Sequence, residues 1–302
     1  MNFIIISISI LISVAFYTIL ERKILSYIQI RKGPNKVGML GILQPFSDAI
    51  KLFNKNLISM ESMNFTLSYI TPSLSLLIMI LIIPIISYNK FPLFDNKHNL
   101  LLFFILSSMS VYFILLIGWS TNSKYCYLGS IRSVAQMISY EISFFMIILF
   151  IVLLSQSYSF TQMEESQMML SFFWGNSVLF FIWMTSCLAE TNRSPFDFAE
   201  GESELVSGFN VEYMGGWFAM IFLAEYMSML LLMMISILMF FKSLNYFNSM
   251  IMLITLSILM IWVRGSYPRF RYDMLMKLSW KIFLPISLLI IMIPSISYMM
   301  FF

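Results

Sequence analysis

Residues 189–213 of this chain read AETNRSPFDFAEGESELVSGFNVEY, and this polar stretch separates two long apolar ones. It carries six of the fifteen carboxylates of the chain against one cation, Arg193. Aromatic and aliphatic residues stand between the acids, whereas a solvated, disordered acidic linker is poor in them. We therefore expect a folded acidic loop at the edge of a membrane, where carboxylates hold or pass protons.

The composition predicts an all-α integral membrane protein. Hydrophobic residues make up 60% of the chain and charged residues 11%, which is far from a soluble domain. The chain also holds 30 Phe and 27 Met, a bias that fits an AT-rich organelle gene. Met1 leads almost directly into the first apolar stretch without an Arg- and Ser-rich presequence, so we expect this stretch to be retained as a span.

Hydropathy predicts about eight transmembrane helices of roughly 20 residues, the length that crosses ~30 Å of hydrocarbon at about 1.5 Å per residue. They fall near residues 2–25, 66–88, 99–120, 130–155, 170–189, 215–241, 248–263 and 280–301. Residues 45–55 predict a short amphipathic helix on the membrane surface, because Phe46, Ile50 and Phe53 share one face and Pro45 suits the first turn. The chain therefore reads as a single polytopic membrane domain, 1–302.

The basic residues predict how the chain is oriented in the membrane. Fifteen of the eighteen Lys and Arg residues fall in or beside the loops on one side, and only Lys90, Lys97 and Lys242 fall on the other. Positive charge collects on the inner side of a membrane. We therefore expect both termini to face outward and four loops to face inward, namely 26–65, 121–130, 190–214 and 264–279.

Three acidic residues are predicted to lie within the membrane. Glu21 stands near the end of the first span, and Glu141 and Glu225 lie about 13 Å into theirs. A charge at the bilayer centre costs about 2.5–3.5 kcal/mol, so such residues usually face a polar interior. Each makes either a structural hydrogen bond as a neutral acid or a step in proton transfer, and the acidic loop on the same chain favours proton transfer.

The sequence offers no ligand set for a metal or a redox centre. Cys126 and Cys187 stand alone, His98 is the only histidine, and no glycine-rich nucleotide motif occurs. We expect this chain to bind no metal or cofactor of its own, and nothing indicates nucleic acid. The basic stretches 31–38 and 264–273 are either topology signals alone or fixed turns that present Arg to a partner.

Seven runs of residues together resemble subunit 1 of NADH:ubiquinone oxidoreductase, respiratory complex I. They are LERK at 20–23, YIQIRKGPN at 27–35, QPFSDAIKL at 44–52, AQMISYE at 135–141, the stretch 189–213, AEY at 224–226 and WVRGSYPRFRYD at 262–273. Runs of this length and order are specific to that family, and the composition favours its mitochondrially encoded form.

The resemblance implies a subunit at the heel of the membrane arm, next to the peripheral arm that takes hydride from NADH. NADH, FMN and the iron–sulfur clusters would belong to partner subunits, and ubiquinone would be the substrate. This chain would form the ubiquinone entrance and part of its tunnel, and would link quinone reduction to proton translocation. Its partners would be the peripheral-arm subunits with the quinone site and the terminal iron–sulfur cluster, the small neighbouring membrane-arm subunits and the lipid bilayer.

The same resemblance implies a location and two sets of site residues. The chain would lie in the mitochondrial inner membrane, with its basic loops on the matrix side and both termini on the intermembrane-space side. The quinone-binding set is Glu21, Arg22, Arg31, Phe222, Arg264 and Arg269. The proton-path set is Glu141, Glu190, Asp197, Glu200, Glu202, Glu204 and Glu225, with Arg193 and Tyr140 in support.

Other functions remain open on the residues alone. The membrane subunit of a related proton-pumping hydrogenase shares part of the acidic loop. A stand-alone cation or proton transporter would also carry intramembrane glutamates, although no internal repeat is visible. A plain membrane anchor for redox subunits would need no acids at mid-depth.

Overall fold

The computed structural model describes residues 2–56, 61–86, 93–94, 96–199, 201, 205–206, 208–241 and 246–301, without the side chains of 246 and 296–301. These residues form helices and connecting segments and contain no strand. The α-helices are α1 (Asn2–Ile28), α2 (Gln44–Phe53), α3 (Phe65–Ile82), α4 (Asn99–Ser120), α5 (Lys124–Ser155), α6 (Phe160–Ser166), α7 (Phe172–Gly175), α8 (Ser177–Glu190), α10 (Gly215–Phe240), α11 (Tyr246–Ser266), α12 (Tyr272–Leu278) and α13 (Leu284–Phe301).

The predicted fold class is confirmed. Seven helical stretches of the described chain are long and apolar enough to cross a membrane, and they coincide with seven of the predicted spans. The predicted surface helix is confirmed as α2, which has a proline in its first turn and exposes Phe46, Ile50 and Phe53. This apolar face is suited to lie on the bilayer.

The predicted span 170–189 is wrong as one continuous helix. It is divided into the four-residue α7 and the fourteen-residue α8, and Asn176 between them has a non-helical backbone (φ −134°, ψ 44°). Gly175 and Asn176 are both weak helix formers, and a break at such a pair costs little. Hydropathy does not register this break, because apolar residues continue on both sides of it.

The predicted inner loop 121–130 is also shorter than expected. The helix α5 begins at Lys124 and places the buried residues Cys126, Gly129 and Ser130 inside the bundle. A Cβ atom at Gly129 would lie 3.1 Å from both Ala199 O and Phe209 N, so any other residue there would require the acidic loop to shift by a few tenths of an ångström. The first turns of α5 therefore pack against the acidic loop.

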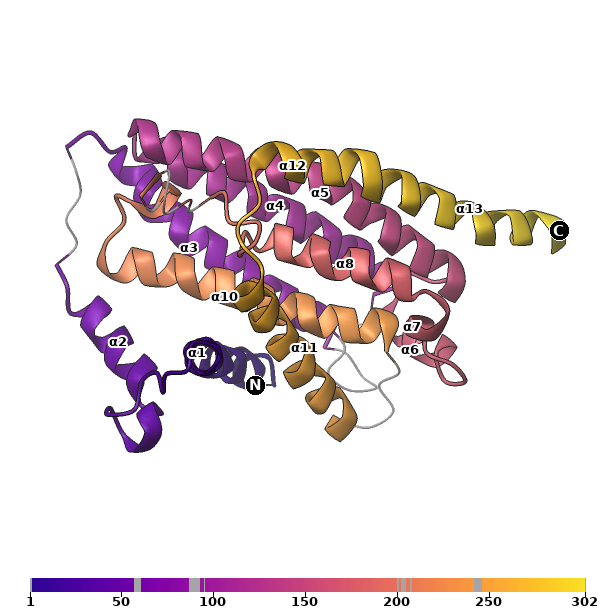
Figure 1. Ribbon diagram of the computed structural model, residues 1–302, viewed down its shortest axis with the longest axis horizontal. Helices are drawn as coiled ribbons and strands as arrows, with labels where there is room; N and C mark the ends of the chain where they lie inside the picture. The colour runs from indigo at the N-terminus through magenta and orange to yellow at the C-terminus, as the bar shows by residue number, and fades with distance from the viewer. Residues whose placement is uncertain are drawn as a thin grey trace.

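Two long helices organise the bundle. Helix α5 packs against α4, α8 and α13, and α10 packs against α3, α1 and α11 (Figure 1). Within the core, Phe144 of α5 stacks on Trp183 of α8 with ring centroids 4.3 Å apart. Helix α12 continues through the π-helical turn Ser279–Phe283 into α13, whose C-terminal end projects beyond the other helices (Figure 1).

The acidic loop is folded against this bundle, as the sequence predicts. In its described part, Phe196, Phe198 and Phe209 are buried. Tyr213, just before α10, lies 2.9 Å from Ser120 Oγ at the end of α4, and burial raises the pKa of its hydroxyl, which stays neutral. The described part of the loop is therefore tied to the end of α4 and is not a solvated linker.

Candidate functional site

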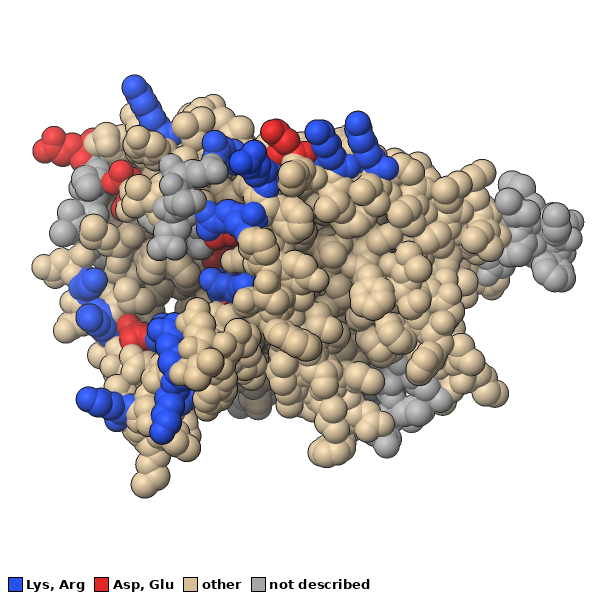
Figure 2. Space-filling model, in the orientation of Figure 1, with Lys and Arg blue, Asp and Glu red and all other residues tan. Residues whose placement is uncertain are grey.

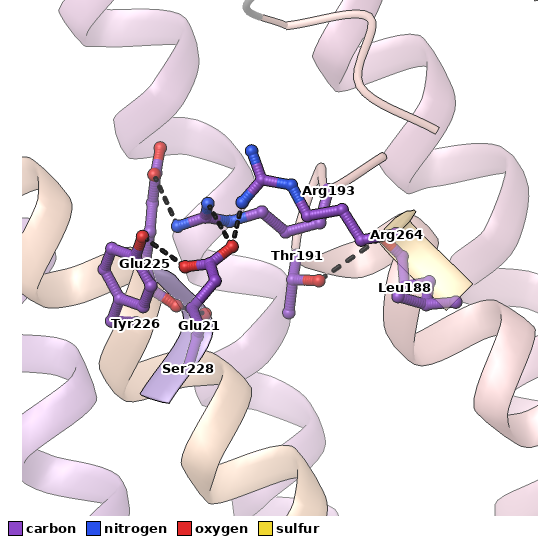
Figure 3. Close-up of polar contacts among 8 residues, drawn as sticks. All are labelled: Glu21, Leu188, Thr191, Arg193, Glu225, Tyr226, Ser228 and Arg264. Atoms are coloured by element: carbon purple, nitrogen blue, oxygen red, sulfur yellow. Dashed lines mark hydrogen bonds and ion pairs between the residues drawn. The ribbon is translucent and has the colours of Figure 1, made fainter. Parts of the chain in front are cut away.

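A buried carboxylate near the end of α1 collects partners from three other segments. Glu21 is only 4% exposed. Its Oε1 accepts a hydrogen bond from Arg264 Nη1 at the end of α11, and its Oε2 accepts one of 2.6 Å from the hydroxyl of Tyr226 in α10. Arg193 Nη1 from the acidic loop lies 3.8 Å from Glu21 Oε1. Figure 3 shows these side chains converging on the Glu21 carboxylate.

Arg193 lies between this carboxylate and a second one. Its Nη2 is 4.0 Å from Glu225 Oε2 of α10, and its guanidinium carbon lies 4.3 Å from the centre of the Tyr226 ring. The Arg193 side chain is 7% exposed and that of Glu225 is 20% exposed. A desolvated cation over an aromatic face gains about 2 kcal/mol or more, and the two carboxylates balance the charges of Arg193 and Arg264.

A second polar contact joins the acidic loop to the basic loop before α12. Arg269 Nη2 donates to Asp197 Oδ2 at 3.2 Å, and the backbone N–H of Phe270 donates to Pro195 O at 3.1 Å. The rings of Phe196 and Phe270 stack with centroids 5.5 Å apart. The two loops thus form one continuous surface, which the sequence alone does not predict.

A buried glutamine of α5 fixes the same segment from the other side. Gln136 is fully buried, and its Nε2 donates to Ala189 O and to Phe196 O, each at 2.9 Å. It therefore bridges the last turn of α8 and the start of the acidic loop. Tyr140, one turn further along α5, packs its ring 6.0 Å from that of Phe196.

A cavity of about 70 Å³ lies between α3, α4, α5, α8 and α10. Two of the acids predicted for the proton path line it: Glu190 at the end of α8 and Glu225 of α10. Glu141 of α5 is half-buried and close enough to Glu190 for the two charges to interact. Glu225 therefore faces Arg193 on one side and the cavity on the other.

The space-filling view shows a gap beside α2, on the side of this helix that faces α1 and α10 (Figure 2). Helix α2 is joined to α1 by the ion pair between Arg22 Nη1 and Asp48 Oδ2 at 2.9 Å, and by the edge-to-face contact of Phe46 with Phe16. Along α10, the ring of Phe222 packs against those of Phe218 and Tyr226, with centroids 4.4 and 6.5 Å away. The row of aromatic rings on α10 therefore reaches the charged cluster through Tyr226, which donates to Glu21.

The structure brings many of the predicted site residues together and leaves others apart. Glu21, Arg193, Glu225 and Arg264 form one cluster, Asp197 and Arg269 form a second, and Arg22 pairs with Asp48. Arg31 is exposed in the loop after α1, and no hydrogen bond or ion pair in the described chain links its side chain to these groups. Glu200, Glu202 and Glu204 lie outside the described residues.

Sequence reasoning missed three residues that complete these contacts. Tyr226 donates to Glu21, Gln136 ties down the acidic loop, and Asp48 holds Arg22. Tyr226 had a signal, since it follows Phe218 and Phe222 at four-residue spacing on one face of α10. No sequence pattern predicts the roles of Gln136 and Asp48, because the residues that they contact are distant in the chain.

Chemically, these contacts suit the binding of polar oxygens and the movement of protons. In the described chain, no group of three or more His, Cys, Asp or Glu residues is placed to hold a metal ion. The two free cysteines are buried apart from each other, one in α5 and one in α8.

Comparisons with known proteins agree on one family. Residues 1–295 match the sequence model of the family described as NADH dehydrogenase. The chain is 50% identical to NADH-ubiquinone oxidoreductase chain 1 of Anopheles gambiae over 282 residues, which cover 93% of this chain and 90% of that protein. It is 48% identical to the Locusta migratoria protein of the same name over 289 residues (95% and 92%). It is 44% identical to the Balaenoptera physalus protein over 294 residues (94% and 91%). The chain therefore belongs to the NADH dehydrogenase family, together with chain 1 of NADH-ubiquinone oxidoreductase from these animals.

Proposed function

We propose that this chain is a membrane subunit of NADH:ubiquinone oxidoreductase, forms the ubiquinone entrance and links quinone reduction to proton translocation. Its relatives carry the name of chain 1 of that enzyme over nearly their whole length. The observation that carries the site assignment is the Glu21 cluster, in which Arg193 and Arg264 meet a buried carboxylate.

The gap beside α2 is suited to a quinone with a long apolar tail. Helix α2 exposes an apolar face, and a row of aromatic rings on α10 leads to Tyr226 beside Glu21, so these two helices offer a tail an apolar route from lipid. At the inner end, Arg264 and Arg193 offer planar cationic donors to quinone oxygens that gain negative charge on reduction. Arg22, Arg31, Phe222 and Arg269 complete the proposed quinone-binding set.

The proton path continues from this cluster through acids. Arg193 joins Glu21 to Glu225, the cavity joins Glu225 to Glu190, and Glu190 interacts with Glu141. A charge that changes at the quinone therefore alters the balance at Arg193 and then at Glu225. Asp197, Glu200, Glu202 and Glu204, with Tyr140 in support, remain part of the proposed path.

Partners supply the redox chemistry in this proposal. NADH, FMN and the iron–sulfur clusters belong to other subunits, and this chain meets the peripheral-arm subunits that hold the quinone site and the terminal cluster. Small membrane-arm subunits and lipid cover its flanks. The chain lies in the mitochondrial inner membrane, with its basic loops in the matrix and its termini in the intermembrane space.

The names of the relatives also help to choose between the ubiquinone enzyme, a proton-pumping hydrogenase and a stand-alone transporter. Each carries the name of the ubiquinone enzyme, which favours that enzyme over the related proton-pumping hydrogenase. A stand-alone transporter would not need arginines gathered beside a row of aromatic rings. Mass spectrometry of the chains that co-purify with this one distinguishes the classes, because a nickel–iron hydrogenase would bring its own subunits.

The quinone role is tested by Arg264→Ala in the assembled enzyme. We expect NADH:ubiquinone turnover to fall by at least tenfold, because the variant removes a charged donor from Glu21. Transfer from NADH to a soluble acceptor should be unchanged, since that route lies in other subunits. Arg271→Ala is the control, because Arg271 is exposed in the same loop. Equal loss of both activities in an intact complex would contradict the proposal.

A further inference from the structure

Tyr17 of α1 carries a buried hydroxyl that none of the contacts described above uses. The residue is 4% exposed, and other atoms of the chain cover its hydroxyl oxygen almost completely. Within the described residues this hydroxyl has no hydrogen-bond partner. Buried polar groups are normally bonded, so a buried hydroxyl without a partner requires an explanation.

The position of Tyr17 brings this hydroxyl close to the Glu21 cluster. Tyr17 and Glu21 are four residues apart in α1 and therefore share one face of the helix. The ring of Tyr17 packs edge-to-face against that of Tyr226, with centroids 5.8 Å apart. The hydroxyl is also close enough to Glu21, Arg193 and Arg264 for their charges to act on it. Tyr17 therefore lies within the cluster although it bonds none of its members.

Two tyrosines are thus placed beside one carboxylate, and only one of them donates to it. The hydroxyl of Tyr226 donates to Glu21 Oε2 over 2.6 Å, and Arg264 donates to Oε1 (Figure 3). A carboxylate offers about four lone-pair positions. Glu21 Oε2 is therefore able to accept a hydrogen bond from Tyr17 in place of the one from Tyr226.

We propose that Tyr17 is a reserve donor for Glu21, whose hydroxyl replaces that of Tyr226 on the carboxylate when Tyr226 donates to an oxygen of the quinone. The inference rests on the proposed quinone role and adds a positioning residue to it. No covalent bond changes, and each hydroxyl keeps its own proton. Glu21 has Arg264 and one tyrosine as donors before and after the exchange, so the buried carboxylate does not lose a partner.

The reduction of the quinone gives this exchange its direction. A neutral quinone carbonyl accepts more weakly than the Glu21 carboxylate, so Tyr226 stays on Glu21 when the quinone first binds. An oxygen that gains negative charge accepts about twice as strongly, and it then competes for Tyr226. The Tyr17 hydroxyl therefore stabilises the charged transition state and not the initial complex, which affects kcat and leaves KM unchanged.

The test removes this hydroxyl with Tyr17→Phe in the assembled enzyme. We expect kcat for NADH:ubiquinone turnover to fall about threefold to tenfold with KM unchanged, as for the loss of one hydrogen bond. The thermal midpoint of the complex should not fall, because the hydroxyl bonds nothing in the resting state. An unchanged kcat, or a higher KM with kcat unchanged, would overturn the proposal.

Thr18→Val is the matched control. It removes a hydroxyl from the next position of α1, where this hydroxyl already donates to Ala15 O over 2.7 Å. We expect kcat to stay normal in this variant. An equal fall of kcat in both variants would mean that α1 is merely sensitive to substitution, and the reserve donor would be wrong.

A double variant distinguishes the exchange from simple packing. In Tyr226→Phe, Tyr17 should donate to Glu21 already in the resting enzyme. Adding Tyr17→Phe then removes the same bond from the resting and the charged state, and kcat should not fall further. If the two substitutions instead lower kcat by the product of their separate effects, Tyr17 acts independently of Tyr226 and the exchange is wrong.

Arg264→Ala separates this inference from the proposed function. If Arg264→Ala stops quinone turnover while Tyr17→Phe is neutral, the reserve donor is wrong and the quinone role of the cluster stands. If both variants reduce ubiquinone normally, the quinone role itself is wrong.

Discussion

Arg193 is the residue on which the contacts of the acidic loop depend most. It is held at comparable distances from Glu21 of α1 and Glu225 of α10, 3.8 and 4.0 Å, and lies over the ring of Tyr226. Removing one partner from a buried pair costs about 3–5 kcal/mol, because it leaves an uncompensated charge. A change of charge at Glu21 therefore alters the electrostatic environment of Glu225, because both carboxylates lie near the guanidinium of Arg193.

The placement of Arg193 depends in turn on Gln136, which leads to a prediction at the residue scale. Gln136→Met keeps the side-chain volume but removes one of the two donors to each of the carbonyls of Ala189 and Phe196, which keep only the backbone N–H groups of Asn192 and Phe198, and each lost bond costs about 0.5–1.5 kcal/mol. We expect NADH:ubiquinone turnover to fall severalfold and proteolysis within residues 189–213 to speed up. Both are measured on the intact complex.

Gln167→Met is the matched control. Gln167 is also buried and donates to two backbone carbonyls, those of Leu238 and Met239 near the end of α10, away from the acidic loop. Its loss should lower the thermal stability of the complex comparably without a specific effect on quinone turnover. Equal kinetic effects of the two variants would show that Gln136 has no positioning role.

Sequence predicts residues of this site only where the signal is local. The charged residues of the Glu21 cluster are conspicuous because a charge in an apolar segment is costly. The partners are not visible in the sequence: Tyr226 and Arg264 meet Glu21 across 205 and 243 positions of the chain. Only packing of α1, α10 and α11 brings them together.

Among the elements, α2 has the clearest consequence for quinone access. It lies on one side of the gap and is held to α1 by Arg22 and Asp48, whose side chains are 52% and 36% exposed. An exposed ion pair contributes only about 0–1 kcal/mol to stability. It can nevertheless set the position of a short helix that few other contacts hold.

We therefore predict that Asp48→Asn changes access more than stability. The KM for a quinone with a long isoprenoid tail should rise about threefold, while that for a short-tailed quinone should change little, because only the long tail spans the gap. The thermal midpoint of the complex should stay the same. Lys51→Gln is the control, since Lys51 is exposed on the same helix and makes no described ion pair. A uniform change in both KM values would contradict the role of α2.

Hydropathy predicts some of the helices of this chain but not all of their boundaries. It identifies seven long apolar helices because each buries or exposes an apolar surface over a full membrane width. It misses the break at Asn176 and the early start of α5, because both arise from local backbone preference or from contact with the acidic loop. Boundaries therefore follow tertiary contacts that no window of sequence contains.

At the scale of the whole molecule, charge is separated from apolar surface. On the face shown in Figure 2, Lys, Arg, Asp and Glu gather at the end that holds α2 and the loop before α12, and the opposite end is almost uncharged. This separation supports the expectation that the basic loops share one side of the membrane. The Glu21 cluster draws on the same loops, since Arg193 comes from the acidic loop and Arg264 from the end of α11.

The orientation can be tested with single cysteines, because both native cysteines are buried. Lys36→Cys and Lys124→Cys should react with a membrane-impermeant maleimide only when the matrix side of the vesicle faces outward. His98→Cys should react only in the opposite orientation. Labelling of all three from one side would contradict the predicted topology. Because partner subunits can cover a position, each labelling is repeated after detergent solubilisation as a positive control.

The central claim is that protons move through the intramembrane acids of this chain when quinone is reduced. The most direct measurement is the number of protons pumped per NADH in sealed vesicles carrying Glu225→Gln or Glu141→Gln, with Glu165→Gln of the exposed end of α6 as control. Glutamine keeps the volume and a hydrogen bond but cannot carry the proton. We predict that all three variants assemble and still transfer electrons from NADH to a soluble acceptor. Quinone-coupled turnover and proton pumping should fall at least tenfold in Glu225→Gln and Glu141→Gln, and should stay normal in Glu165→Gln. Normal pumping and turnover in both would mean that these glutamates make structural hydrogen bonds and that the proton path lies elsewhere.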